Sequence, residues 1–110
     1  MASLAGQVGG VLAGAHYAAA KAGVISLTRS IAKRYAEFGI TANALAPSAV
    51  ETEMLGAFTP AQLEGLQAQT PLHRFAHPDE IAGIIAFLAS PAAATITGHT
   101  VNVNGGLYLA

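Results

Sequence analysis

Two long stretches of this chain carry no charged side chain. The first twenty and the last thirty residues contain no Asp, Glu, Lys or Arg. Soluble domains average about 25% charged residues, whereas this 110-residue chain has 10%. A chain of this length buries only about 60–70% of the surface that it exposes when unfolded. The sequence therefore predicts a membrane protein, an obligate subunit with large apolar contacts, or a piece of a larger fold.

Neither charge-free stretch is suited to a bilayer. Four glycines dilute the first stretch, which also lacks the basic leader of a signal peptide. The second stretch has one continuous apolar block, Ile81 to Ala89, before Ser90 and Pro91. A spanning helix needs ~20 apolar residues. We expect no membrane association and a soluble, cytoplasmic protein.

Composition excludes several other functions. Five Lys and Arg against six Asp and Glu, with no run of either sign, argue against nucleic-acid binding. The absence of cysteine excludes disulfides, Cys-ligated zinc and thiol catalysis. His73 and His77 are four residues apart, but Pro78 follows at once and the stretch resembles a loop. Two surface histidines are favoured over a zinc site, and we expect no metal.

The first part of the chain predicts a loop followed by a long helix. Residues 1–14 are small and rich in glycine, which suits a loop that approaches a ligand or another element closely. From about Ala15 to Phe38 apolar residues recur at helical spacing, and Gly39 is placed as the C-cap. This apolar row consists of Val24, Leu27, Thr28, Ile31, Tyr35 and Phe38.

The remaining elements predict an α/β fold. Ile40 to Ala46 suits a buried strand, and residues 47–58 suit a loop. Thr59 to Gln62 matches a capping box that starts a helix through about Gln69, and Pro78 starts another helix through Ala89. His99 to Asn104 suits a last strand. Strands separated by helices indicate a parallel sheet, and because two strands are rarely stable alone, sheet partners are predicted to be missing.

One pair of side chains suggests chemistry. Tyr17 and Lys21 lie four residues apart, so both project from one face of the predicted helix. A phenol is a poor acid–base group at neutral pH, and a nearby ammonium favours the phenolate. Ser3, on the glycine-rich loop, can donate a hydrogen bond to a carbonyl oxygen on which charge develops. Taken alone, the pair favours an ordinary helix surface, because a tyrosine four residues before a lysine occurs by chance in many helices.

The surroundings of this pair resemble one family along nearly the whole chain. Ser3, the run from Tyr17 to Val24, the run from Gly39 to Pro47, Thr52 and the ending from Thr97 to Gly106 occur in the order and spacing of classical short-chain dehydrogenase/reductases. The run Glu51 to Met54 and the ending Val103 to Tyr108 are most similar to bacterial 3-oxoacyl-(acyl carrier protein) reductases.

The resemblance implies a role for each matching residue. Tyr17 matches the acid that protonates the carbonyl oxygen, Lys21 matches the residue that supports this tyrosine and holds the nicotinamide ribose, and Ser3 matches the serine that orients the carbonyl. It also implies NAD or NADP as cofactor and a small-molecule carbonyl or alcohol substrate. Homo-oligomers are common in this family.

The segment after the strand predicted over Ile40 to Ala46 matches residues that contact the cofactor and the substrate in this family. Pro47, Val50 and Thr52 match residues that touch the nicotinamide and its carboxamide, and residues 53–70 match the substrate lid. Ser48 stands where the family usually has glycine, which would disfavour a positive φ and crowd the nicotinamide. Ser3 and Tyr17 are fourteen positions apart, one more than is usual, which one insertion in the loop explains.

The family's dinucleotide-binding turn has no counterpart here. The glycines before Tyr17 follow no strand and lack the fingerprint spacing of a pyrophosphate-binding turn. The resemblance therefore predicts that residues 1–110 form a single partial domain, the C-terminal catalytic half of a Rossmann-like doubly wound parallel sheet, without the nucleotide-binding N-terminal half. Two hypotheses follow: part of an NAD(P)-dependent oxidoreductase, or a truncated, inactive remnant that at most associates with related subunits.

Overall fold

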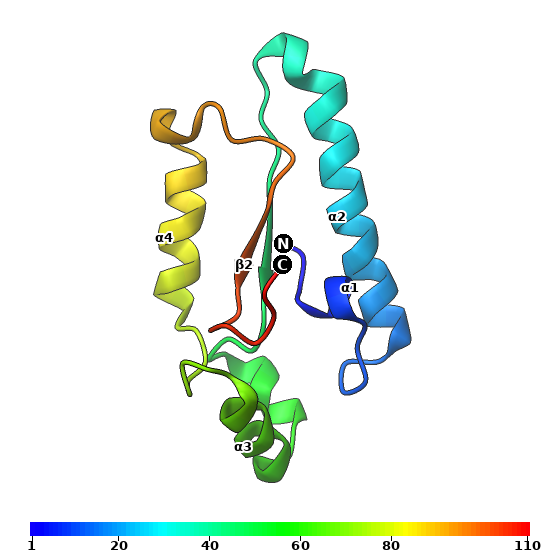
Figure 1. The fold of residues 1–110 in the computed structure, drawn as a ribbon, viewed down its shortest axis with the longest axis vertical. Coiled ribbons are helices and arrows are strands. Elements are labelled where there is room, and N and C mark those ends of the chain that lie inside the picture. Colours follow the sequence, from blue (N-terminus) through cyan, green and yellow to red (C-terminus); the bar gives the residue numbers. More distant parts are fainter.

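Two parallel strands lie between two long helices in a computed structural model that describes residues 1–110 (Figure 1). The α-helices and strands, in chain order, are α1 (Ala5–Val8), α2 (Ala15–Tyr35), β1 (Ala44–Pro47), α3 (Pro60–Gln69), α4 (Pro78–Leu88) and β2 (Thr100–Val103). Three 3-10 turns separate them, η1 (Ala36–Phe38), η2 (Glu53–Ala57) and η3 (Pro91–Ala93). The predicted α/β class with a parallel sheet is confirmed.

Strand β1 has a hydrogen-bonded neighbour on each side. On one side it pairs in parallel with β2, with Ala44 opposite Thr100 and Pro47 opposite Val103. On the other side the N–H of Ala2 donates to the carbonyl of Leu45 at 2.8 Å, and the N–H of Leu4 donates to the carbonyl of Pro47 at 2.9 Å. The first four residues therefore extend the sheet alongside β1, although they form no regular strand.

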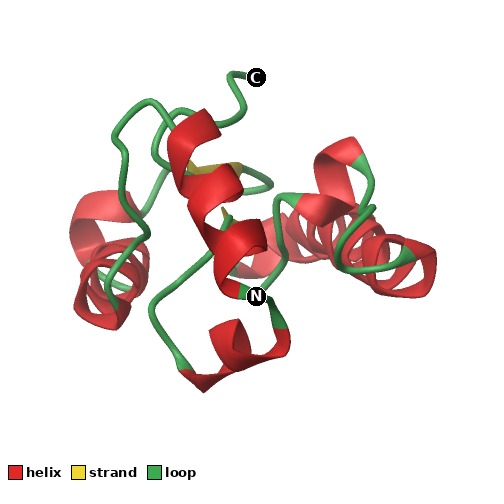
Figure 2. Cartoon of the chain, turned by 90° about the horizontal axis from the view of Figure 1, so that it is seen from below, coloured by secondary structure: helices red, strands yellow, loops and turns green.

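The core is small and made mostly of alanine. Ala2, Ile25, Ala44 and Ala46 form its buried cluster, with Val24 packed against it. Helix α2 supplies Ile25 and Val24 from one side, whereas α4 lies on the other side of the strands (Figures 1 and 2). Alanine side chains allow the first segment, β1 and α2 to approach closely, which places the residues at the start of the chain next to the long helix.

The buried stripe of α2 differs from the predicted apolar row. Its fully buried residues are Ala18, Ile25 and Ala32, at intervals of seven. Leu27 and Phe38 of the predicted row are 60% and 69% exposed. These larger side chains of the row lie beside the stripe, where nothing within the chain covers them. Gly39 does end this helical segment, with the left-handed φ of 72° that suits a glycine cap.

Some element boundaries in the structure differ from the predicted ones, and tertiary contacts explain the difference at β1. The predicted loop over residues 1–14 contains the short helix α1, and residues 47–58 contain η2. Strand β1 begins at Ala44 instead of Ile40 because its partner strand begins only after the turn at Gly98, whose N–H donates to the carbonyl of Ala42. The side chain of Asn43 holds that turn by donating to the carbonyl of Ile96 at 2.8 Å.

Helices α3 and α4 begin where the proline signals predict. Thr59 and Gln62 form the predicted capping box, with Oγ1 of Thr59 accepting from the N–H of Gln62 at 3.2 Å. Helix α4 begins at Pro78. None of the helices has the combined length and apolarity that a crossing of the bilayer would need.

Candidate active site

Ser3 lies where the first sheet segment turns into helix α1. Its position is fixed from both sides, because Leu4 donates to Pro47 on β1 and the N–H of Gly6 donates to the carbonyl of Ser3 at 3.0 Å. The Oγ of Ser3 accepts from the N–H of Ala5 at 3.2 Å. The hydroxyl proton of Ser3 has no acceptor in the structure, so it is available to a bound oxygen atom.

Tyr17 and Lys21 occupy the first two turns of α2, on the face that α1 contacts. The ammonium of Lys21 lies 5.5 Å from the centre of the Tyr17 ring. It also donates a hydrogen bond to the carbonyl of Met1 at 3.2 Å. Both side chains are half-buried. The structure thus places Tyr17 beside Lys21 and joins Lys21 to the segment that carries Ser3, and the catalytic roles of these three residues stay predictions.

The segment after β1 lies at the same end of the sheet but makes no contact of its own with this pair. Pro47 is buried at the end of β1. Val50 forms an isolated bridge with Ala76, and the exposed Thr52 donates its N–H to the carbonyl of Val50 at 2.7 Å. Roles of Pro47, Val50 and Thr52 toward a cofactor therefore stay predictions.

Ser48 does not cause the backbone strain expected of a serine in place of glycine. Its N–H donates to the carbonyl of Val103 at 3.1 Å, which continues the pairing beyond β1. The only residue other than glycine with a positive φ is His73, at 52°. Ser48 thus adopts a conformation that any residue can take, and this departure from the family leaves the backbone intact.

His77 acts as a local structural residue. The Nδ1 of His77 accepts from the N–H of Asp79 at 3.3 Å at the start of α4. Its own N–H donates to Oε2 of Glu80 at 2.8 Å. Histidine is not a usual N-cap residue, so sequence signals did not reveal this role. No group of three or more His, Asp or Glu side chains is placed to hold a metal ion.

An ion pair lies next to this cap at the start of α4. Arg74 donates to the two carboxylate oxygens of Glu80 with its two terminal guanidinium nitrogens, at 2.6 and 2.8 Å. The hydrogen bonds from Arg74 and then from the backbone of His77 lower the pKa of Glu80 to about 2. The hydrogen bond to Glu80 raises the pKa of Arg74 in turn. The pair links the segment after α3 to the first turn of α4.

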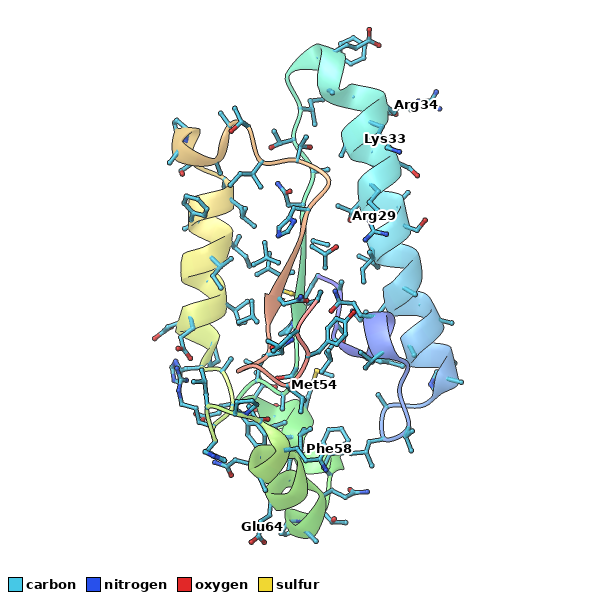
Figure 3. The ribbon with its side chains drawn as sticks, in the orientation of Figure 1. Arg29, Lys33, Arg34, Met54, Phe58 and Glu64 are labelled. Atoms are coloured by element: carbon cyan, nitrogen blue, oxygen red, sulfur yellow. The ribbon has the colours of Figure 1, made fainter.

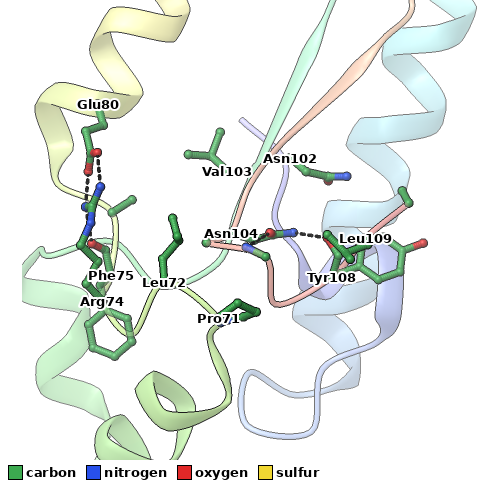
Figure 4. A pocket seen from close by; sticks show the side chains of 14 residues that line it. Pro71, Leu72, Arg74, Phe75, Glu80, Asn102, Val103, Asn104, Tyr108 and Leu109 are labelled. Carbon is green, nitrogen blue, oxygen red and sulfur yellow. Dashed lines mark hydrogen bonds and ion pairs between the residues drawn. The ribbon is translucent and has the colours of Figure 1, made fainter.

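One hollow of the molecule is lined by none of Ser3, Tyr17 and Lys21. It has a volume of about 620 Å³ and lies between residues 71–76 and the end of the chain (Figure 4). Arg74 pairs with Glu80 there, and Asn104 contacts the backbone of Gly106 and Tyr108, whereas the buried Oδ1 of Asn102 has no hydrogen-bond partner. Arg74, Glu80 and Asn104 thus already have partners, and the region of Ser3 and Tyr17, to which the family resemblance points, is the candidate active site.

Two other groups of side chains lie at opposite ends of the molecule (Figure 3). Arg29, Lys33 and Arg34 project from the second half of α2, at the end away from η2 and α3. Met54 and Phe58 lie on and just after η2, beyond the carboxyl ends of the strands, and Met54 is 70% exposed. The segment with η2 and α3 therefore presents apolar side chains at the end of the sheet where Pro47 lies.

Comparison with known proteins identifies the class. The family model described as enoyl-(acyl carrier protein) reductase matches residues 1–108. A crystal structure of a short-chain dehydrogenase/reductase from Brucella melitensis superposes with a TM-score of 0.90 at 41% identity, covering 99% of this chain and 44% of that one. The chain belongs to the short-chain dehydrogenase/reductase family, and the predicted family and its Rossmann-type fold are confirmed.

Within this family the chain is similar to 3-oxoacyl-(acyl-carrier-protein) reductases. It is 52% identical to that of Vibrio cholerae over 95 residues, which cover 86% of this chain and 39% of the relative. It is 45% identical to that of Staphylococcus aureus over 109 residues, which cover 99% of this chain and 44% of the relative. The chain thus spans about two-fifths of the length of these relatives.

Proposed function

We propose that this chain is the catalytic and substrate-binding part of an NAD(P)-dependent oxidoreductase that interconverts carbonyl and alcohol groups. The observation that carries the proposal is the pairing of Lys21 with the Tyr17 ring, together with the hydrogen bond from Lys21 to the carbonyl of Met1, two residues before Ser3. The similarity to 3-oxoacyl-(acyl-carrier-protein) reductases favours a 3-oxoacyl thioester as the substrate.

The donor set fits one end of a nicotinamide cofactor. The Lys21 ammonium has three donors and uses one of them on the carbonyl of Met1, which leaves two for ribose hydroxyls. The Tyr17 hydroxyl makes no hydrogen bond within the chain and is free to face the same group. When bound, a reduced nicotinamide supplies the hydride. We propose Pro47, Val50 and Thr52 as further cofactor contacts, on the family resemblance.

Each proposed catalytic residue has a defined task in the reduction. Ser3 donates its free hydroxyl proton in a hydrogen bond to the substrate carbonyl oxygen, which stabilises the negative charge that develops there. Tyr17 transfers its phenolic proton to that oxygen, which completes the alcohol. Lys21 stabilises the resulting phenolate by its positive charge. In the reverse direction Tyr17 acts as the base.

The test is a chimera in which this chain replaces the matching region of the Vibrio cholerae reductase. We expect oxidation of NADPH or NADH with a 3-oxoacyl thioester, and loss of at least about 100-fold in kcat for Tyr17→Phe because the proton donor is removed. Tyr35→Phe, on the same helix and without a hydrogen bond, is the matched control. Full activity of Tyr17→Phe would refute the role. The same chimera should also be assayed with an enoyl thioester, because the matching family model is described as enoyl-(acyl carrier protein) reductase.

We propose as the second candidate that the 110 residues by themselves are an inactive remnant that associates with related subunits. The large exposed apolar side chains, among them Phe38 and Met54, are the observation that favours it. The isolated chain would then neither change nicotinamide fluorescence nor turn over substrate, while still binding the relative in a pull-down. Fluorescence quenching by the isolated chain would contradict this second proposal.

A further inference from the structure

Helix α1 packs against the backbone of α2 at the turn that carries Lys21. A Cβ atom built on Gly6 would lie 2.6 Å from the carbonyl carbon of Lys21 and 2.7 Å from the nitrogen of Ala22. Real Cβ atoms do not approach other heavy atoms this closely, and these neighbours are backbone atoms that cannot rotate away. Any side chain at position 6 would therefore push α1 and α2 apart.

Gly6 is also joined to Ser3. The N–H of Gly6 donates to the carbonyl of Ser3 at 3.0 Å, and the hydroxyl of Ser3 accepts from the N–H of Ala5 at 3.2 Å. The same short turn thus holds Ser3 at one end and contacts the backbone of Lys21 at the other. The distance between the serine hydroxyl and the Tyr17–Lys21 pair depends on how closely this turn can approach α2.

A second contact ties the same two segments together. The ammonium of Lys21 donates to the carbonyl of Met1, two residues before Ser3, at 3.2 Å. Movement of α1 away from α2 would stretch this hydrogen bond and release the lysine side chain. Two contacts, one by packing and one by a hydrogen bond, therefore depend on the absence of a side chain at position 6.

We infer that Gly6 is a positioning residue that sets the placement of Ser3 relative to Tyr17 and Lys21. This inference rests on the proposed function of those three residues. Gly6 would touch neither the substrate nor the cofactor, and it acts only by allowing α1 to approach α2 closely. Gly23 provides the contrast, since a Cβ atom there meets nothing within 4 Å.

The first experiment measures the reactivity of lysine in the 110-residue chain. The chain contains only two lysines, Lys21 and Lys33, so amine acetylation followed by mass spectrometry gives their ratio in one sample. We expect Gly6→Ala to raise the reactivity of Lys21 relative to Lys33 by about three- to tenfold, the range expected for the loss of one hydrogen bond. Gly23→Ala, two residues from Lys21, should leave the ratio unchanged.

The second experiment measures turnover in the chimera with the Vibrio cholerae reductase. We expect Gly6→Ala to lower kcat about 100-fold, as for displacements of about 1 Å in an active site, with KM for the thioester unchanged. Gly6→Ser should cause the same loss, because the clash arises at Cβ. Gly23→Ala should retain the kcat of the parent chimera.

The outcomes separate the two proposals. If the parent chimera is inactive, the proposed function fails and the lysine ratio alone decides the role of Gly6 in packing. If Gly6→Ala does not fold, nuclear Overhauser contacts in the unmodified chain between the Hα protons of Gly6 and the amide proton of Ala22 decide it. An unchanged lysine ratio, an unchanged kcat in an active chimera, or the absence of these contacts would overturn the inference.

Discussion

The hydroxyl of Ser3 is engaged on one side only. Its oxygen accepts from the N–H of Ala5, whereas its proton has no acceptor. The Tyr17 hydroxyl likewise has no partner, while the Lys21 ammonium contacts the carbonyl of Met1. At the scale of single residues, the site therefore consists of two unsatisfied hydroxyl donors beside one partly engaged cation, which is suited to receiving a polar oxygen atom.

The Ser3→Ala variant tests the carbonyl-orienting role. We expect kcat of the chimera to fall by about 10²–10³-fold, the cost of removing one donor to a developing oxyanion. Loss of the hydrogen bond from Ala5 should lower the free energy of unfolding by only about 0.5–1.5 kcal/mol, which thermal melting checks. Ser26→Ala on α2 is the control, and equal kcat values for the two variants would contradict the assignment.

At the scale of elements, side chains at their first turns hold α3 and α4 in place. Thr59 and Gln62 exchange hydrogen bonds at the start of α3, at 2.9 and 3.2 Å. At the start of α4 the side chain of His77 accepts from the N–H of Asp79, the N–H of His77 donates to Glu80, and Glu80 also binds Arg74. Because α3 has no fully buried residue, its stability depends on these local bonds more than on packing.

The Thr59→Ala variant tests this dependence. Removal of an N-cap hydroxyl costs about 1 kcal/mol, and we expect hydrogen exchange of the α3 amides to accelerate by about fivefold or more, the factor for 1 kcal/mol. The amides of α2 should not change. Thr59→Ser keeps the accepting oxygen and should behave as the unmodified chain. Equal exchange in Thr59→Ala would show that packing, instead of the cap, holds α3.

The Glu80 carboxylate should make stability depend on pH in the acid range. Its pKa falls from the usual 4.5 to about 2 in the folded chain, chiefly by the hydrogen bond from Arg74. The stabilisation is therefore fully present above about pH 4.5 and is lost as the pH falls toward 2. Denaturation midpoints between pH 6 and 2 should fall less steeply in Glu80→Gln than in the unmodified chain.

Glu64→Gln is the control for this pH dependence. Glu64 is an exposed carboxylate on α3 without an ion pair, so its replacement should leave the slope unchanged. Glutamine at position 80 can still accept from the N–H of His77, which keeps the cap and removes only the charge. Parallel slopes for Glu80→Gln and the unmodified chain would refute the contribution of this pair.

At the scale of the whole molecule, the chain exposes more surface to solvent than a compact protein of its mass. Only 12 of 110 residues are buried, and the accessible surface is 6845 Å². A compact protein of this mass exposes about 5,700 Å². The radius of gyration is 14.8 Å, against about 13 Å for a compact chain of this length. The charge-free stretches of the sequence thus become open faces, as the exposed Ile85 and Phe87 of α4 illustrate.

These open faces lead us to expect association of the isolated chain. It should bind a hydrophobic dye strongly, scatter light as oligomers, and melt over a broad temperature range. The chimera with the Vibrio cholerae reductase should bind less dye for each copy of the chain, because the relative supplies further sheet neighbours. A monodisperse isolated chain that melts cooperatively as a monomer would contradict this expectation.

Local signals by themselves determined helices α2, α3 and α4, the caps at Gly39 and Thr59, the α/β class and the Tyr17–Lys21 pair, because Pro78, Gly39 and a four-residue spacing act within one or two turns. Only the tertiary structure decided that Met1 to Leu4 lie along β1 and that Gly6 meets the backbone of Lys21. Those contacts join residues that local periodicity does not relate, and they depend on how closely packed backbones approach one another.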